Sequence, residues 1–388
     1  MKIIYLSSLC SIAEYERLFE RYGTTSSHAS QKFHRLLTRG FFENGVQIET
    51  VTHRSLQKVS ADALKEKTEE FDGIIYNYLP QTKYKKFNRL YIVLKAYKKL
   101  KQIKKQNADM NICVDILRGE LSIAVALFSF FNKCKTIGIV TDVPSFRADE
   151  TRKGIKALPI KFKNFLISRY DLYVFLTEKM NTELNPKHKP YVIIEGIADD
   201  KISEGCREGT VKYPEKVIML AGLLEKEYGI DDLVEAFYGI KDDDIRLHIY
   251  GKGKSVKLIK EYAEKDGRIK FFGEALNQVV VSEEKKATLL VNPRKALGEW
   301  VNYSFPSKNI EYIASGTPLL AYELPCIPID YKDKYFIIEN DDLRASLEKC
   351  ISLEKNELNE FGKNAQSWIL ENKNPKNQSK KIIDMIFN

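Results

Sequence analysis

The chain has 388 residues, of which 44% are hydrophobic and 30% are charged. This composition describes a soluble globular protein, and the length excludes a single small domain because one hydrophobic core rarely supports so long a chain. The formal net charge of +9 raises the question of an anionic partner.

Cysteine usage and the apolar segments exclude two further classes. Six cysteines are scattered along the chain without the spacing of a metal site or a redox pair. This usage is typical of a reducing compartment, so we expect the protein in the cytosol. The apolar part of MKIIYLSSLC is too short for a signal peptide, and residues 121–131 are too few to span a bilayer. An integral membrane protein is therefore not expected.

Apolar runs typical of strands alternate with helical patterns along the chain. The strands predicted in the first half are residues 2–6, 46–51, 73–78, 111–117, 136–141 and 172–176. Those predicted in the second half are residues 216–222, 245–251, 269–273, 288–292 and 318–322. This alternation is the signature of βαβ units. The sequence therefore predicts two Rossmann-like, doubly wound α/β domains, with a ligand crevice between them at the carboxyl ends of their strands.

The domain boundaries follow from composition. Residues 195–216 are polar, contain glycines and include few apolar residues, which indicates a linker. We expect an N-terminal domain at residues 1–194, a linker at 195–215 and a C-terminal domain at 216–370. Residues 371–388 are expected to form a C-terminal helix, for which packing back on the N-terminal domain is an open possibility.

The segment Tyr303–Leu320, YSFPSKNIEYIASGTPLL, carries the most informative pattern. Pro306 opens an amphipathic run where its missing N–H costs little, so the amides of the next three residues are expected to point out of a helix N-terminus, which attracts anions. One turn later, Glu311 offers a carboxylate that can accept hydrogen bonds from both hydroxyls of a ribose. Gly316 and the residues after it end the helix. On spacing alone, an ordinary helix explains the pattern equally well.

The sequence FPSKNIEYIASGTPLLAYELP resembles the donor-site signature of glycosyltransferase family 4, in the branch that builds capsular polysaccharide, exopolysaccharide and lipopolysaccharide. The resemblance implies the GT-B fold, with the donor diphosphate at the helix N-terminus and the nucleotide ribose on Glu311. Most members carry a second Glu eight positions earlier, near the donor sugar. Tyr303 occupies that position in this chain, and Glu299 would need a different loop path to replace the missing carboxylate.

Two glycines, Gly222 and Gly229, resemble the family's first loop of the C-terminal domain, where the backbone approaches the diphosphate closely. The Arg and Lys that relatives carry there are replaced by Leu223 and Tyr228. Lys226 lies between them, and a diphosphate contact and a solvated loop lysine are equally good interpretations.

Arg294 directly follows a predicted buried strand. It is therefore expected to point into the crevice and to supply the missing cation, with an ordinary surface arginine as the alternative.

The resemblance assigns the acceptor to the first half of the chain. Asp142 stands where many relatives carry a His-Asp pair that lines the donor sugar; the His is absent here, and turn chemistry before Pro144 is the alternative role. The residues that open the first long predicted helix resemble the family's acceptor-side loop: His28, Ser30, Gln31 and Lys32. Lys32 is a candidate contact for a lipid-linked diphosphate, or it lies on a solvated helix face.

These assignments give one set of candidate residues. For catalysis they are Asp142, Glu311 and Tyr303, and for donor binding they are Gly222, Lys226, Arg294, Ser304, Pro306, Ser307, Lys308 and Glu311.

Basic residues are concentrated in two segments without acidic residues. Lys83–Lys105 holds ten Lys or Arg, and its apolar residues recur at helical spacing: Leu90, Val93, Leu94, Tyr97 and Leu100. Arg152–Arg169 adds six more basic residues. Such segments suit an anionic membrane surface, with nucleic acid and a Lys-rich solvated face as the alternatives.

Metal chemistry has little support, because the histidines show no ligand spacing and no Asp-x-Asp element stands where an ion would bridge the donor phosphates. We expect no cofactor, with the helix N-terminus and cations stabilising the leaving diphosphate. The resemblance implies a retaining, metal-independent glycosyltransferase that moves a sugar from a nucleotide sugar to a lipid-linked polysaccharide precursor at the cytoplasmic face of the membrane. The alternatives are a catalytically degenerate nucleotide-sugar-binding partner subunit, motivated by Tyr303 and Leu223, and a basic adaptor for membranes or nucleic acid.

Overall fold

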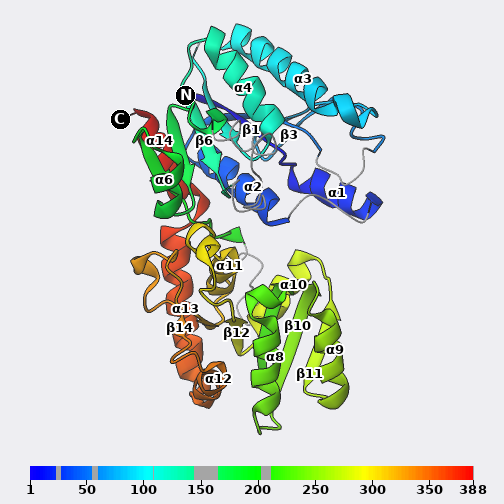
Figure 1. Cartoon of the computed structure of the whole chain (residues 1–388), viewed down its shortest axis with the longest axis vertical. Coiled ribbons are helices and arrows are strands. Elements are labelled where there is room, and N and C mark those ends of the chain that lie inside the picture. The colour runs from blue at the N-terminus through cyan, green and yellow to red at the C-terminus, as the bar shows by residue number, and fades with distance from the viewer. Residues whose placement is uncertain (23–27, 55–59, 108, 144–164, 202–210, 388) are drawn as a thin grey trace. The chain divides into compact units, whose positions relative to one another are not determined.

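The computed structural model (Figure 1) describes residues 1–22, 28–54, 60–107, 109–143, 165–201 and 211–387. The chain divides into two compact units. Unit 1 contains Met1–Ile197 and Pro375–Asn388, and unit 2 contains Ala198–Asn374. The larger part of the predicted basic segment Arg152–Arg169, up to residue 164, lies outside the described residues.

Unit 1 is built on a sheet of eight strands in the order β3-β4-β2-β1-β5-β6-β7-β8. Its strands are β1 (Lys2–Ser7), β2 (Gln47–Thr52), β3 (Lys67–Phe71), β4 (Ile74–Tyr78), β5 (Asn111–Asp115), β6 (Thr136–Val140), β7 (Leu172–Phe175) and β8 (Tyr191–Ile193). Every neighbouring pair is parallel except β3 and β4. The strand order reverses at β1, as in a doubly wound fold.

Helices cover the sheet of unit 1. They include α1 (Ile12–Tyr22), α2 (His28–Glu43), α3 (Lys85–Gln106), α4 (Gly119–Phe131), α6 (Glu178–Leu184) and α14 (Pro375–Phe387). Helices α3 and α4 pack side by side, and the last helix of the chain, α14, packs on α2 (Figure 1). Gly40 permits this approach, because a Cβ there would lie 2.0 Å from the carbonyl oxygen of Pro375. Gln378 Nε2 also donates to the carbonyl of Gly196 at 2.7 Å, so both ends of the chain contribute to unit 1.

Unit 2 has a sheet of six strands in the order β11-β10-β9-β12-β13-β14, with all pairs parallel. The strands are β9 (Lys216–Leu223), β10 (Ile245–Lys252), β11 (Ile269–Gly273), β12 (Leu289–Asn292), β13 (Leu319–Ala321) and β14 (Phe336–Ile337). Its described helices are α8 (Ile230–Gly239), α9 (Val256–Lys265), α10 (Asn277–Lys286), α11 (Ser307–Ala314), α12 (Leu343–Ser352) and α13 (Lys355–Asn372), with short 3-10 turns η2 (Lys226–Tyr228), η3 (Glu299–Tyr303) and η4 (Ile329–Tyr331).

Every strand predicted from the sequence is present, and three strands were not predicted. Strand β3 has the sequence KTEEF and lies at the sheet edge, antiparallel to β4. An edge strand contacts one neighbour only and tolerates charged residues, so it lacks the apolar run of a buried strand. Strands β8 and β14 have three and two residues, too few for a pattern to emerge.

Candidate functional site

The predicted donor-site residues lie at the carboxyl ends of neighbouring strands in unit 2. Strand β9 is flanked by β10 and β12, and this is where the strand order of unit 2 reverses. Ligands of open α/β sheets bind outside the carboxyl ends of strands at such a switch point. Gly222 lies at the end of β9, and Arg294 follows β12 by two residues.

The backbone around Gly222 is packed tightly on one side and open at its α-carbon. A Cβ on Gly251 would lie 1.9 Å from the carbonyl oxygen of Gly222, so β10 and β9 meet closely where both strands end. A Cβ on Gly222 itself would meet nothing within 4 Å. Gly229, with a φ of 75°, lies so close to Pro293 that a Cβ would reach its carbonyl oxygen at 2.1 Å. Glycine is required at both contacts for steric reasons.

Arg294 is a buried cation beside this turn, with 6% of its surface exposed. Its Nη2 donates to the carbonyl of Ser304 at 2.9 Å, and its guanidinium carbon lies 4.3 Å from the centre of the Trp300 ring. Its Nε is buried and makes no hydrogen bond within the described residues. Burial lowers the pKa of the guanidinium, and no carboxylate of the described chain contributes to offset this. A buried cation without a carboxylate partner can hold an anionic ligand.

Helix α11 begins one residue later than the pattern predicted, because Pro306 is its N-cap. The amide of Asn309 donates to the carbonyl of Pro306 at 2.8 Å. The prediction of three open amides is therefore wrong for Asn309, since an i to i+3 bond closes the first turn. The amides of Ser307 and Lys308 make no hydrogen bond within the described residues. They leave an anion-attracting end of two amides.

Lys308 and Glu311 form an ion pair with each other, one turn apart on α11. The ammonium also lies 3.5 Å from Oε1 of Glu284, a fully buried residue of α10. Burial alone would lower the pKa of Lys308, but the two carboxylates outweigh it and the pKa is raised. Lys308 was predicted to bind the diphosphate and Glu311 the ribose. In this structure the two side chains neutralise each other, and both roles stay predictions.

Tyr303 and Glu299 stand at opposite ends of the same short turn, η3. Tyr303 is buried, with 4% of its surface exposed, whereas Glu299 is exposed. Ser304 follows directly and contributes its carbonyl to Arg294. The turn therefore leads into the Ser304 carbonyl that binds Arg294, with Tyr303 buried and Glu299 in solvent.

Lys226 lies apart from α11, on the exposed turn η2. It lines a hollow of about 470 Å³ whose other lining residues are Glu225, Glu227, Asp231, Lys254, Ser255, Lys257, Leu258 and Glu261. Four carboxylates against three lysines do not favour a diphosphate. The diphosphate role of Lys226 stays a prediction, with less support than that of Arg294.

The acceptor-side candidates lie in unit 1. Asp142 follows β6, and its Oδ1 accepts a hydrogen bond from the amide of Val143 at 2.8 Å, which is turn chemistry. Helix α2 begins at His28. Gln31 is buried: its Oε1 accepts from the amide of Cys10 at 2.8 Å, and its Nε2 donates to the carbonyl of Ser8. Gln31 therefore holds the loop after β1 in place, and Asp142 stays a predicted ligand.

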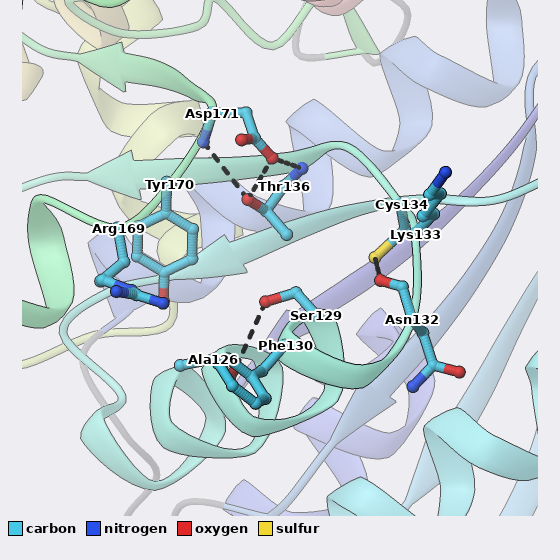
Figure 2. Close-up of a pocket in the computed structure, with 10 residues that line it drawn as sticks. All are labelled: Ala126, Ser129, Phe130, Asn132, Lys133, Cys134, Thr136, Arg169, Tyr170 and Asp171. Carbon is cyan, nitrogen blue, oxygen red and sulfur yellow. Dashed lines mark hydrogen bonds between the residues drawn. The ribbon is translucent and has the colours of Figure 1, made fainter.

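One pocket of unit 1, of about 220 Å³, contains none of the predicted site residues (Figure 2). It lies where α4 ends and where β6 and β7 begin, at the amino edge of the sheet. Asp171 accepts hydrogen bonds from both the amide and the hydroxyl of Thr136 there, at 2.9 and 2.7 Å (Figure 2). Its carboxylate is thus used to fix the strand start, and the pocket lies at the edge opposite to where doubly wound sheets bind ligands.

The basic helix α3 has two apolar faces rather than the single one expected. Val93 and Leu100 are buried, and Tyr97 packs against Phe128 of α4 with ring centres 6.2 Å apart. Leu90 and Leu94 are instead 59% and 60% exposed. The expected single stripe is therefore wrong, because its members divide between the core and the solvent.

The outer face of α3 is itself divided along its length. Phe87, Leu90 and Leu94 are exposed in its first half, and the lysines at the same helical phase in its second half are exposed as well: Lys98, Lys101 and Lys105. At the end of the neighbouring helix α4, Phe130 and Phe131 are both 71% exposed. We refer to these eight residues as the α3–α4 surface.

No group of His, Cys, Asp and Glu residues that could hold a metal ion is present among the described residues. Helices long and apolar enough to cross a bilayer are likewise absent from the part of the chain that the structure describes.

Three contacts of the site were missed at the sequence level. The hydroxyl of Tyr312 bonds to the backbone of Ala221, Nδ2 of Asn292 donates to Oδ1 of Asn309 at 2.6 Å, and Glu284 lies beside Lys308. All of them join residues at least 17 positions apart. A local pattern carries no signal for such pairs, although the buried polar side chains that make them are a recurrent feature of ligand sites.

Comparisons with known proteins concern the fold and the family of the chain. Residues 207–385 match the family model described as "Glycosyl transferases group 1". No curated protein sequence matches the chain. Among solved structures, sucrose-phosphate synthase from Thermosynechococcus elongatus is similar at 13% identity and a TM-score of 0.69, over 100% of this chain and 98% of that one.

Two further structures have the same fold. The trehalose-6-phosphate synthase OtsA is 10% identical with a TM-score of 0.70, over 100% of this chain and 99% of that one. Anabaena HepE in complex with UDP and glucose is 12% identical with a TM-score of 0.63, over 100% and 99% of the two chains. At such identities the likeness shows the fold, which is GT-B. The group 1 match of residues 207–385 indicates a glycosyltransferase.

Proposed function

We propose that the protein is a retaining, metal-independent glycosyltransferase of the capsular, exopolysaccharide and lipopolysaccharide branch of family 4. It transfers a sugar from a nucleotide sugar to a lipid-linked saccharide. The group 1 match of residues 207–385 and the similar structures solved with UDP or UDP-glucose support a nucleotide-sugar donor. Retention and the polysaccharide branch rest on the resemblance of the segment around Glu311 to the family signature.

The observation that carries this proposal is the environment of Arg294. Its buried guanidinium has an Nε without a hydrogen-bond partner in the described chain, and it makes no ion pair there with Asp or Glu. Keeping an uncompensated cation buried is unfavourable unless an anion joins it when the ligand binds. The carbonyl of Ser304 joins Arg294 to the loop that leads into α11. A donor diphosphate would satisfy both Arg294 and the two open amides of α11.

The same groups suit the chemistry of transfer. When the sugar–phosphate bond breaks, negative charge develops on the leaving diphosphate, and fixed donors aimed at it lower the barrier most. Arg294 and the helix N-terminus supply such donors without a metal ion. No protein nucleophile is needed if the leaving phosphate accepts the proton of the attacking hydroxyl. Glu311, one turn further on, would accept hydrogen bonds from the hydroxyls of a ribose.

A thermal-shift screen with UDP-, GDP-, ADP- and CMP-sugars tests the donor site. A ligand at 100 times its Kd should add about 2.7 kcal/mol to the free energy of unfolding. The shift should persist in EDTA, because no metal is required. It should be largely lost in Arg294→Met and kept in Arg344→Met, a matched change at an arginine of unit 2 that pairs with Glu348 in solvent. An equal shift in both variants would remove Arg294 from the donor site.

The alternative of a catalytically degenerate nucleotide-sugar binder is motivated by Tyr303 and Leu223, which replace groups that relatives carry. Binding alone does not separate it from an enzyme. A turnover assay separates the two. It measures release of labelled sugar from the donor that gives the largest thermal shift, with membrane extract as the source of acceptor. Binding without any turnover would favour the degenerate subunit.

We further propose that the enzyme works on the cytoplasmic side of the membrane, bound through the α3–α4 surface. Exposed apolar side chains next to exposed lysines suit an anionic bilayer, in which the apolar groups insert and each basic residue adds about 1 kcal/mol near the headgroups. Phe87, Leu90 and Leu94 supply the apolar part, and Lys98 and Lys101 part of the basic one. The part of Arg152–Arg169 that the structure describes adds an exposed Phe165 and Arg169.

Vesicle sedimentation tests this attachment. The protein should sediment with vesicles that contain 30% anionic lipid and stay in the supernatant with neutral vesicles. It should dissociate from the anionic vesicles as salt rises past physiological strength. The triple change Lys98, Lys101 and Lys105→Glu should abolish binding. The matched change of three exposed lysines of α9, Lys257, Lys260 and Lys265→Glu, should not. Equal binding by both triple variants would exclude this surface, and a preference for RNA over vesicles would favour the nucleic-acid adaptor.

A further inference from the structure

Tyr312 makes an unusual pair of contacts in the core of unit 2. It lies on α11, directly after Glu311, and its side chain is 2% exposed. The amide of Ala221 donates to its hydroxyl at 2.8 Å, and the hydroxyl donates back to the carbonyl of Ala221 at 2.9 Å. One side chain thus satisfies both backbone groups of a residue 91 positions away.

Sheet geometry explains why Ala221 needs this partner. In a parallel strand, alternate residues direct both their N–H and C=O to the same neighbour. On β9, Val217 accepts from the amide of Thr288 at 2.8 Å, and Met219 lies opposite Leu290, so the β12 side of β9 is occupied up to Met219. Ala221 is the next residue that faces this side.

Strand β12 is no longer beside β9 at that point. Its last residue, Asn292, pairs with Ala321 on β13, and the following residue is Pro293, which has no N–H to offer. Ala221 would therefore keep two unpaired backbone groups in a buried position, where 4% of its surface is exposed. The hydroxyl of Tyr312 takes the place of the missing strand.

We propose that Tyr312 is a positioning residue of the donor site. It fixes the end of β9, and with it the turn at Gly222, to the helix whose N-terminus is proposed to bind the diphosphate. The hydrogen bond from Asn292 to Asn309, 2.6 Å long, joins the same helix to the end of β12. The ends of β9 and β12 and the loop of Arg294 are thereby held in fixed positions relative to α11. This inference rests on the proposed function of the site.

The chain offers a matched control for the loss of a buried tyrosine hydroxyl. Tyr173 of β7 is 1% exposed, and its hydroxyl donates to the carbonyl of Ile167 at 2.5 Å in unit 1. Tyr312→Phe and Tyr173→Phe each keep the buried ring and remove one hydroxyl that bonds to backbone. A merely structural role predicts similar consequences for both variants.

Two measurements on the full chain test the proposal. Hydrogen exchange should be at least tenfold faster in the peptide that contains Ala221 and Gly222 in Tyr312→Phe, and unchanged there in Tyr173→Phe. Affinity for the nucleoside diphosphate that binds the wild-type protein best, among UDP, GDP and ADP measured by calorimetry, should fall at least tenfold in Tyr312→Phe alone. A wild-type affinity in Tyr312→Phe would overturn the proposal, as would unchanged exchange at Ala221.

The proposed function and the positioning role of Tyr312 can be contradicted separately. If the wild-type protein binds none of the three nucleotides, the proposed function is contradicted, and the donor-site role of Tyr312 falls with it even where exchange is faster. If the wild-type protein binds one of them and Tyr312→Phe binds it equally well, only the positioning role is contradicted.

Discussion

Helices α11 and α3 were both singled out by the sequence, and the structure treats them differently. In α11, all residues from Asn309 to Ala314 are buried, and the polar ones among them, Asn309, Glu311 and Tyr312, are engaged in specific contacts. In α3, the apolar residues divide between a buried set and a set that faces solvent. One helix buries polar groups, and the other exposes apolar ones.

Both arrangements are unusual for a globular protein, in which polar side chains are mostly exposed and large apolar ones are mostly buried. A buried polar group is unfavourable unless its hydrogen bonds are satisfied, so a helix that keeps several of them is shaped by more than packing. A contiguous patch of exposed apolar side chains is typical of a surface that binds a protein or a membrane. The comparison thus contrasts the proposed donor site with the proposed membrane-binding surface.

The largest expected effect is a change in the free energy of unfolding, and it compares two leucines of α3. Leu100 and Leu94 are the same residue type on one helix, 0% and 60% exposed. Leu100→Ala should lower the free energy of unfolding by about 2–5 kcal/mol, because it leaves a cavity against α4 and the sheet. Leu94→Ala should change it by less than about 0.5 kcal/mol. Urea denaturation measures both, and similar losses would show that Leu94 belongs to the core.

These two leucines also show which features of the fold could be predicted from the sequence. Helical spacing identified the helix and its apolar residues, but Leu94 and Leu100 differ only in which neighbour they meet, and that depends on α4. Strands were predictable because buried parallel strands are continuous apolar runs. The edge strand at Lys67–Phe71 was not, because solvent replaces one of its neighbours. The start of α11 was predicted from Pro306 to within one residue and its end from Gly316, but its link to Ala221 depends on where β12 separates from β9.

The next effect concerns α11 and tests whether its buried carboxylate serves a ligand. Glu311→Ala should weaken nucleoside diphosphate binding by roughly ten- to a hundredfold, since a charged hydrogen-bond partner contributes about 1.5–3 kcal/mol. The fold should persist, because Lys308 keeps the carboxylate of Glu284 at 3.5 Å and is one-third exposed to solvent. Calorimetry measures the affinity. The same change at Glu299, which is exposed, serves as the control, and an unaltered affinity in Glu311→Ala would place the ribose elsewhere.

A somewhat smaller effect is expected from the cation that holds this carboxylate. Lys308→Met leaves Glu311 and Glu284 together without their shared ammonium. Removing one partner of a fully buried pair costs about 3–5 kcal/mol, and partial exposure of Lys308 reduces this to roughly 2 kcal/mol. Protonating one carboxylate relieves the repulsion, so the deficit relative to wild type should shrink as pH falls from 7 towards 4. Denaturation at both pH values measures this, and a deficit that does not vary with pH would contradict the assignment.

The smallest expected effect is on turnover, and it tests whether the buried phenol of Tyr303 contacts the donor sugar. Tyr303 is 4% exposed at the end of η3, next to the Ser304 carbonyl that binds Arg294, and it stands where relatives carry a carboxylate near the donor sugar. A neutral phenol can bond to a sugar hydroxyl, but more weakly than an ionised group.

Tyr303→Phe should therefore lower turnover about tenfold, equivalent to about 1.4 kcal/mol, with nucleoside diphosphate affinity nearly unchanged, because the phenol is expected to contact the sugar and not the nucleotide. Tyr303→Ala should cost more, since the buried ring also packs the wall. Tyr238→Phe, at a half-exposed tyrosine of α8, is the control for the loss of a hydroxyl. Steady-state kinetics with the donor from the nucleotide-sugar screen decides the matter. If both Tyr303 variants turn over like the wild type, the sugar is read by other groups, and Asp142 is the next residue to substitute.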